Sequence, residues 1–228
     1  MSASLSLTGF PLEGTKIAWE ASSVAPLVGL QPPVRERAGM LSLEGLSRDF
    51  VHALRAFAAA GLDDALQARM SSSPITSPDD ALDAFLSVAQ DAGLAESYAD
   101  VARFCHARSW VSGQPIREAP HAVDRLTPFV RVPHRAVRCS VPIHLYVAGD
   151  VDDPAALTPG PTTYLVVRDP DMPLQTEALE VQSAVFLDAL LSSEPLEAML
   201  ARSPHVAQWM RWLADLGEAR FLLWLLPR

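Results

Sequence analysis

Three side chains near the middle of the sequence have the types and the regular spacing of metal ligands. His134, Cys139 and His144 recur every five residues, and imidazole and thiolate groups are common ligands of zinc and other transition metals. The segment around them has β-like spacing, so an odd interval places successive members on opposite faces of one strand. A shared site would need a bend at Pro142. A buried cysteine beside two ordinary histidines is the simpler interpretation, and we predict no metal site.

A second pair, Cys105 and His106, has the types of an activated thiolate and its base. The two are adjacent in a segment with helical periodicity, where neighbours diverge by about 100° and do not face each other. We therefore predict that Cys105 packs in the core. The sequence also lacks a phosphate-binding glycine loop, a Gly-x-Ser-x-Gly elbow, a His-Glu-x-x-His motif and a Cys-x-x-Cys motif. We expect no catalytic residues and no cofactor; an enzyme whose site follows no known motif is an alternative.

Basic side chains are concentrated in one segment of an acidic chain. Between residues 121 and 138 one acid is outnumbered by four arginines, Arg125, Arg131, Arg135 and Arg138, although the whole chain has a net charge of -9. A basic edge could steer an acidic peptide or a partner protein toward the molecule. Alternatively, the arginines keep a solvated strand edge from pairing with other chains.

Composition excludes several classes of protein. Of the 228 residues, 49% are hydrophobic and 20% are charged, which is typical of a packed globular chain. The net negative charge opposes binding to nucleic acid or anionic lipid. Only two cysteines occur, and the first residues lack the basic start of a secretory signal. The longest apolar run, residues 221–226, is far shorter than the ~20 residues that span a bilayer. We expect a cytoplasmic chain that binds neither membrane nor nucleic acid.

The periodicity predicts an α+β fold with an N-terminal arm at residues 1–46 and a helical domain at residues 47–114. Its first helical segment starts at Ser47 and is divided at Gly61. A second helix begins at Pro78, because Ser77 can cap it, and it ends near Gly93. A third helix covers residues 96–111. These segments predict a small helical bundle.

The remaining residues, 115–228, predict a small sheet followed by helices. Apolar residues at β-like spacing run from residue 130 to residue 147, and residues 162–168 give the strongest strand signal in the chain. A largely buried helix is expected over residues 177–191, a short helix ends near residue 201, and a further helix covers residues 204–216. Residues 221–226 predict a final buried strand.

This order of strand, helix, short helix and helix resembles the small peptide-recognition domains of ribosomal peptide biosynthesis, of which PqqD is the simplest. Such domains bind a leader peptide as an added strand at a sheet edge, in a groove floored by the last helix. The resemblance implies peptide-binding positions on the strand and on that helix. On the strand they are Thr162, Tyr164, Val166 and Arg168, and on the helix they are Val206, Met210 and Leu213. Under this hypothesis, Arg168→Glu weakens peptide capture and leaves the fold intact.

A helical domain joined to such a module also resembles the partner subunits of multinuclear non-haem iron oxidative enzymes, including the methanobactin-type partner. The resemblance covers about residues 47–217 and rests on pattern, with no invariant motif. It implies a non-catalytic subunit that forms a heterodimer with the iron enzyme and presents a ribosomally made precursor peptide to it, the iron belonging to the enzyme. The alternative is a winged-helix transcriptional regulator. A DNA-reading helix needs several basic residues, and residues 205–213 offer only Arg211.

Overall fold

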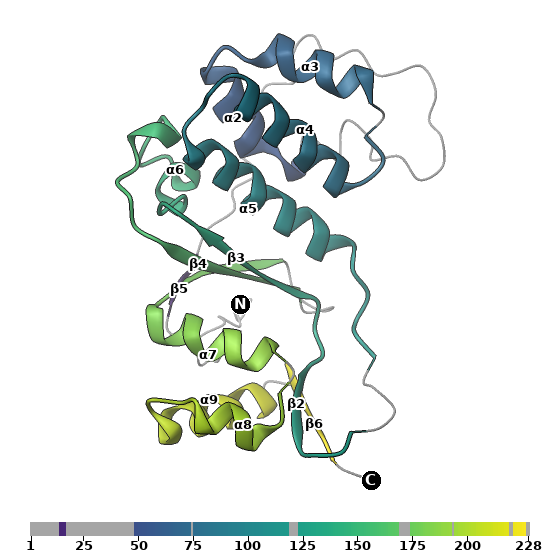
Figure 1. The fold of residues 1–228 in the computed structure, drawn as a ribbon, viewed down its shortest axis with the longest axis vertical. Coiled ribbons are helices and arrows are strands. Elements are labelled where there is room, and N and C mark those ends of the chain that lie inside the picture. Colours follow the sequence, from purple (N-terminus) through teal and green to yellow (C-terminus); the bar gives the residue numbers. More distant parts are fainter. Residues whose placement is uncertain are drawn as a thin grey trace, which may run out of the picture.

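The computed structural model describes residues 14–16, 48–73, 75–118, 123–168, 174–192, 194–218 and 221–226. A four-stranded sheet lies between two helical layers, with a bundle on one face and the C-terminal helices on the other (Figure 1). The described residues form eight α-helices, one 3-10 helix and six strands. The predicted α+β class is confirmed.

Helices α2 (Val51–Ala59), α3 (Asp63–Ser72), α4 (Pro78–Asp91) and α5 (Glu96–Gly113) form the bundle. Gly61 has a φ of 73°, a conformation that suits glycine and separates α2 from α3 as predicted. The aromatic rings of Phe50 and Phe57 both pack on Phe85 of α4, with centroids 5.5 and 5.0 Å away. These contacts join the first helix to the third.

The predicted start of α4 is confirmed in its details. The Ser77 hydroxyl accepts a hydrogen bond from the Asp80 amide, and the Asp80 carboxylate accepts one from the Ser77 amide. Hydrogen bonds to this carboxylate, first of all from the Thr76 side chain, lower the pKa of Asp80. A reciprocal capping box of this kind satisfies two amides that the helix itself leaves without partners.

The main sheet is antiparallel and has the order β1-β5-β4-β3. Its strands are β1 (Gly14–Lys16), β3 (His134–Cys139), β4 (Thr162–Val167) and β5 (Gln175–Leu179). Strand β4 pairs with β3 on one side and β5 on the other. The expectation that residues 162–168 form a free edge is therefore wrong. The physical reason is that a continuous apolar run belongs in the middle of a sheet covered on both faces.

Two further predictions fail around this sheet. Residues 175–179, which include the predicted start of a helix, form β5, and the helix begins only at Val181. Residues 143–147 are not a strand: Ile143 is the N-cap of α6 (His144–Ala148), which ends where Gly149 adopts a φ of 86°. A helix of five residues is too short to show its period in the sequence. A 3-10 turn, Pro154–Ala156, follows before β4.

The C-terminal layer contains α7 (Val181–Leu191), α8 (Leu196–Ala201) and α9 (Val206–Glu218). Beside it, β2 (Thr127–Val130) pairs with β6 (Leu222–Leu225) in a separate two-stranded sheet. The final strand was expected to be buried, yet Leu223 and Trp224 are 37% and 38% exposed. Because these adjacent residues lie on opposite faces of the strand, both faces of β6 are partly open.

The two faces of the main sheet belong to two hydrophobic cores. Tyr164, Val166 and Ala178 pack with the helical bundle. Their neighbours Leu165, Val167 and Leu179 pack with α7, α8 and α9. The core therefore does not divide at residue 114, because the bundle rests directly on the sheet. Within the described part of the chain, no helix combines the length and apolarity needed to cross a bilayer.

Candidate functional site

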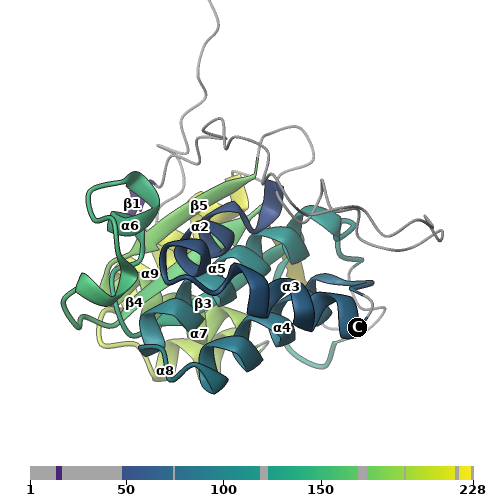
Figure 2. The same cartoon turned by 90° about the horizontal axis from the view of Figure 1, so that it is seen from above.

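The edge of β5 holds an extended segment from a distant part of the chain. Gly14, Thr15 and Lys16 of β1 pair in antiparallel register with Leu179, Ala178 and Glu177. Figure 2 shows β1 beside β5 at one margin of the sheet. Main-chain hydrogen bonds hold such a pair whatever the side chains are. This edge can therefore accept an added strand.

The side chains of β5 alternate between the two cores. The Thr176 hydroxyl accepts a hydrogen bond from Arg108 of α5, and Ala178 belongs to the core of the bundle. Glu177 and Leu179 consequently point to the other face, where Leu179 packs with the C-terminal helices. Glu177 is only 5% exposed. A carboxylate thus lies on the α9 side of the sheet at the strand that accepts β1.

Helix α9 presents two kinds of apolar residue to this layer. Four of them are buried in the hydrophobic core that the C-terminal helices form with one face of the sheet, which we call the lower core: Trp209, Trp212, Leu213 and Leu216. Val206 and Met210 lie beside that buried stripe, at 48% and 42% exposure. Of the three predicted floor positions, Leu213 is therefore a core residue and only the other two are accessible.

The predicted peptide-binding positions on β4 face inward. Tyr164 and Val166 have no exposed surface. The Tyr164 hydroxyl accepts a hydrogen bond from the His144 amide at 3.2 Å and lies 2.9 Å from Nδ1 of the same residue. Burial raises the pKa of Tyr164. Thr162 is half-buried and bonds the carbonyl of Gly160. Tyr164 and Val166 therefore support the fold and offer no surface to a peptide, whereas Thr162 keeps part of its surface exposed.

Arg168 also has a structural role in this arrangement. Its guanidinium donates to the carbonyl oxygens of Ser112 and Gln114 at the end of α5, the second at 3.4 Å. Its amide donates to the Pro133 carbonyl at 2.9 Å. These hydrogen bonds hold the partly exposed Arg168 side chain against the end of α5, and its contact with a peptide stays a prediction.

The four arginines do not form one patch on one face of the sheet. Arg135 of β3 lies over the Trp110 ring of α5, and Arg138 pairs with Asp188 of α7 on the opposite face. Arg131 is exposed and its amide donates to the Phe221 carbonyl. Arg125 lines a shallow groove beside β2. The arginines thus surround the outer edge of β3 and the neighbouring ribbon from several directions.

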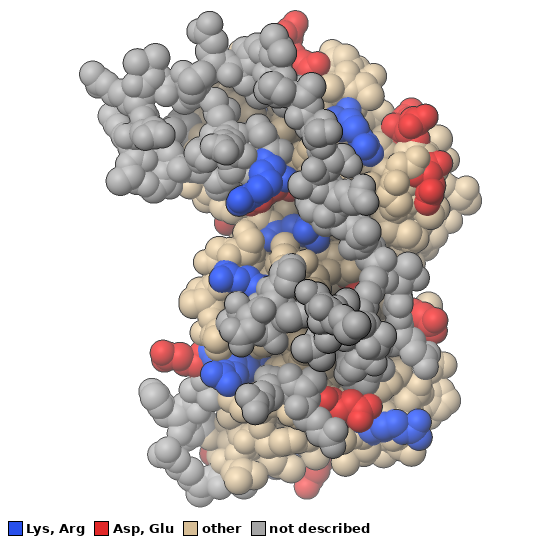
Figure 3. Space-filling model, turned by 180° about the vertical axis from the view of Figure 1, so that it is seen from behind, with Lys and Arg blue, Asp and Glu red and all other residues tan. Residues whose placement is uncertain are grey.

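Figure 3 shows basic side chains on one face of the molecule, from the helical bundle to the C-terminal layer, with acidic side chains beside several of them and along the outline. The part of this face that the structure describes therefore carries no continuous basic patch.

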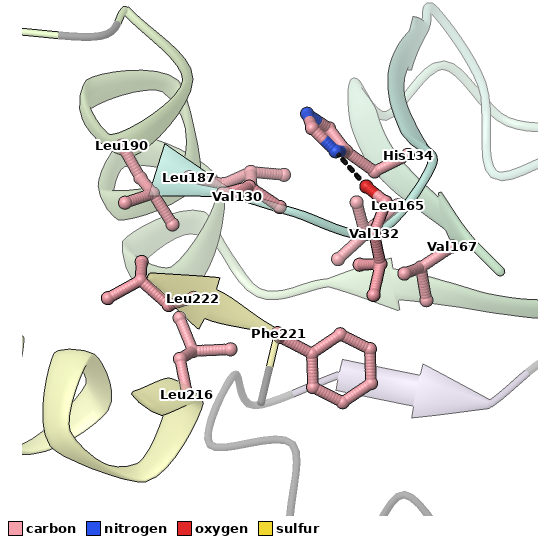
Figure 4. A pocket seen from close by; sticks show the side chains of 10 residues that line it. All are labelled: Val130, Val132, His134, Leu165, Val167, Leu187, Leu190, Leu216, Phe221 and Leu222. Carbon is pink, nitrogen blue, oxygen red and sulfur yellow. Dashed lines mark hydrogen bonds between the residues drawn. The ribbon is translucent and has the colours of Figure 1, made fainter. Parts of the chain in front are cut away.

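A small cavity lies where the two sheets meet. Apolar side chains of both sheets, α7 and α9 surround it, and its volume of about 20 Å³ holds roughly one water molecule (Figure 4). His134 stands at its rim, with Nδ1 2.8 Å from the Val132 carbonyl. This cavity is a packing gap and is too small for a substrate.

The histidines and cysteines considered as chemical groups have other partners. Cys105 and Cys139 are both free and buried, and burial raises the pKa of Cys105 to about 12. His106 lies 2.7 Å from the Asp79 carboxylate, and its pKa is lowered by burial. Within the described ranges, no three His, Cys, Asp or Glu side chains gather in a way that could hold a metal ion.

Two parts of this site, Glu177 and residues 14–16, were not predicted from the sequence. Glu177 lay in a segment interpreted as the start of a helix, and β1 lay in a proline-rich arm without a sustained period. The available signals were the β-branched Thr15 and the chain's single lysine, Lys16. The sequence matches no protein-family model and no curated protein.

Proposed function

We propose that this chain is a non-catalytic partner subunit that binds a ribosomally made precursor peptide and presents it to a multinuclear non-haem iron enzyme. The peptide adds to the sheet as a strand, and main-chain hydrogen bonds worth about 1 kcal/mol each hold it in place. The iron and the oxidative chemistry belong to the enzyme. The chain supplies recognition and orientation.

One observation supports the proposal most directly, the pairing of β1 with β5. A three-residue segment far away in the sequence adds to this edge through its backbone. An extended peptide would use the same donors and acceptors. The binding edge in this proposal is therefore β5, in place of the buried β4.

Helix α9 gives the proposed groove an apolar wall. Its buried stripe belongs to the same hydrophobic core as Leu179 of β5, and Val206 and Met210 remain accessible beside that stripe. Exposed apolar side chains of this kind suit a peptide that presents alternate side chains to the protein. The arginines on the far side of the sheet, around β3, are left for docking the enzyme.

The test begins with the genes that neighbour the chain's own gene, which are searched for a short precursor peptide and an iron enzyme. We expect fluorescence anisotropy to show saturable binding of the labelled peptide to the purified chain, and we expect the chain to co-purify with that enzyme. Charge reversal at Arg125 and Arg131 should weaken the co-purification without changing peptide affinity. Reversal of two exposed acids in the bundle, Asp64 and Asp91, is the matched control.

A DNA duplex in the same assay separates this function from a transcriptional regulator. The accessible face of α9 carries one basic side chain, Arg211, beside Val206 and Met210. We expect no binding to the duplex at physiological salt. Tight duplex binding with a steep salt dependence, together with no response to the peptide, would favour the regulator.

A further inference from the structure

We infer that the β5 edge selects an extended segment carrying a Lys or Arg opposite Glu177, and that the chain's own Gly14–Lys16 is a resident segment of this kind which a peptide must displace. The inference rests on the proposed function. It adds the chemistry of the ligand and an intramolecular competitor.

The selection follows from the register. Glu177 pairs with Leu165 of β4 on its inner side and with Lys16 on its outer side. Directly opposite residues in an antiparallel pair share a face of the sheet. Leu165 and Leu179 belong to the lower core, so the register position of Lys16 is on that face too. Glu177, at 5% exposure, provides a negative charge in a largely desolvated place.

A charge in such surroundings discriminates strongly between partners. Removing a carboxylate from water is costly unless a cation or hydrogen-bond donors accompany it. A segment with a basic residue at this position adds a positive charge opposite Glu177, whereas an acidic residue there brings two like charges together. The single lysine of the chain lies at this register position.

The resident strand lowers the apparent affinity of any incoming peptide. Because β1 is tethered, its effective concentration at β5 is on the order of millimolar. It covers only three residues of the edge, so a longer peptide can form more main-chain bonds and replace it. The apparent dissociation constant equals the intrinsic constant divided by the fraction of molecules in which β1 is unpaired.

The first experiment opens the edge and offers the resident sequence back as a separate peptide. Adjacent residues of a strand alternate in the direction of their N–H groups. The double substitution Thr15→Pro/Lys16→Pro therefore removes one ladder donor whichever residue provides it. The probe is a fluorescein-labelled peptide of residues 11–19, PLEGTKIAW. We expect it to bind the double-proline chain at least tenfold more tightly than the unsubstituted chain.

The matched control is Thr15→Val/Lys16→Arg, which keeps strand propensity and the positive charge. We expect its affinity for the probe to equal that of the unsubstituted chain. Circular dichroism and a thermal midpoint establish that the double-proline chain folds. If it does not fold, Lys16→Glu opens the edge with the backbone intact. Hydrogen exchange at the amides of β5 provides a second measurement, with faster exchange in the opened chain and renewed protection on adding the probe. Equal affinity for opened and unsubstituted chains, or no binding to either, overturns the inference.

The second experiment tests the basic residue with a double-mutant cycle on the opened chain. Replacing the lysine of the probe by glutamine, or Glu177→Gln in the chain, should each weaken binding about tenfold. The two changes together should weaken it little more than either one alone, because each removes the same pair. Independent, multiplicative losses contradict the role assigned to Glu177.

These outcomes are distinct from those of the proposed function. If the probe binds the opened chain and the precursor peptide does not, the proposed function fails and the resident-strand inference holds. If the precursor binds equally well to the opened and the unsubstituted chain, the peptide function holds and the resident strand has no role in it.

Discussion

At the scale of single residues, side chains that a sequence pattern marks as binding groups are here part of the internal framework. Tyr164 joins β4 to the start of α6 through its hydroxyl and packs edge-on against Phe104 at 5.1 Å. Arg168 joins the end of β4 to the last turn of α5. Both hold two layers of the molecule together. Substitution of either residue should therefore lower the stability of the fold much more than the affinity for a peptide.

Tyr164→Phe should lower the free energy of unfolding by about 1 to 3 kcal/mol, since it removes the hydroxyl that accepts the His144 amide. Urea denaturation measures the change. Peptide affinity of the folded fraction should stay within twofold of the unsubstituted chain. If the variant were as stable as the unsubstituted chain but bound the peptide much more weakly, Tyr164 would be a peptide-binding residue.

Arg168→Leu should also destabilise the chain by about 1 to 3 kcal/mol, because the carbonyls of Ser112 and Gln114 lose a charged donor. Arg168→Lys, which keeps one charged donor, should have a smaller effect. The thermal midpoints of the two variants and their affinities for the peptide separate the structural role from a direct contact. An unchanged midpoint for Arg168→Leu would argue against the structural role.

At the scale of elements, α9 and β5 together determine what the candidate site can bind. One stripe of α9 is committed to the core, and the adjacent Val206 and Met210 are accessible. Strand β5 is enclosed by β4 on its inner side and reached by β1 on its outer side. The accessible part of the site is thus a strand edge and the exposed flank of a helix.

Two substitutions in α9 distinguish its buried residues from its exposed apolar residues. Met210→Ser should change the free energy of unfolding by less than about 0.5 kcal/mol and weaken peptide capture. Leu213→Ala should cost about 2 to 5 kcal/mol, because Leu213 is fully buried. Chemical denaturation and anisotropy on both variants check the pair. The reverse pattern would mean that Leu213 floors the groove.

At the scale of the whole molecule, one sheet connects two hydrophobic cores, so both helical layers depend on it. Buried polar groups reinforce the contact between the helical bundle and the sheet. Asp100 of α5 is 2% exposed and accepts hydrogen bonds from the amide and the hydroxyl of Ser140, both at 2.6 Å. The bundle and the sheet should therefore unfold in one cooperative transition.

Stability should fall as the pH is lowered from about 6.5 toward 4. Burial, followed by the nearby Arg55, lowers the pKa of His52 to about 4 from its ordinary 6.5. Burial also lowers the pKa of His106, His134 and His144. In this window the unfolded chain binds more protons than the folded chain, so acidification favours unfolding. The protonation of His52 alone should lower the free energy of unfolding by about 3 kcal/mol as the pH falls through this window.

Urea denaturation at pH 7, 5.5 and 4.5 measures this dependence. His52→Gln should flatten the decrease between pH 6.5 and 4, because glutamine takes up no proton. His205→Gln, at an exposed position, is the control and should leave the slope unchanged. A slope that His52→Gln does not alter would show that the protonation of His52 is not coupled to folding.

The amino-acid sequence by itself determined the α+β class, the divided first helix, the capped start of α4 and the helices α8 and α9. These features depend on residues within one or two turns of one another, such as Gly61 or the pair Ser77 and Asp80. Only the tertiary structure decided which strand is central and which is an edge, because strand order depends on pairing between distant segments. The apolar run of β4 was compatible with an edge or a centre until β3 and β5 were placed beside it. The position of Lys16 opposite Glu177 likewise exists only in the folded chain, where backbone pairing joins an N-terminal segment to a strand far along the sequence.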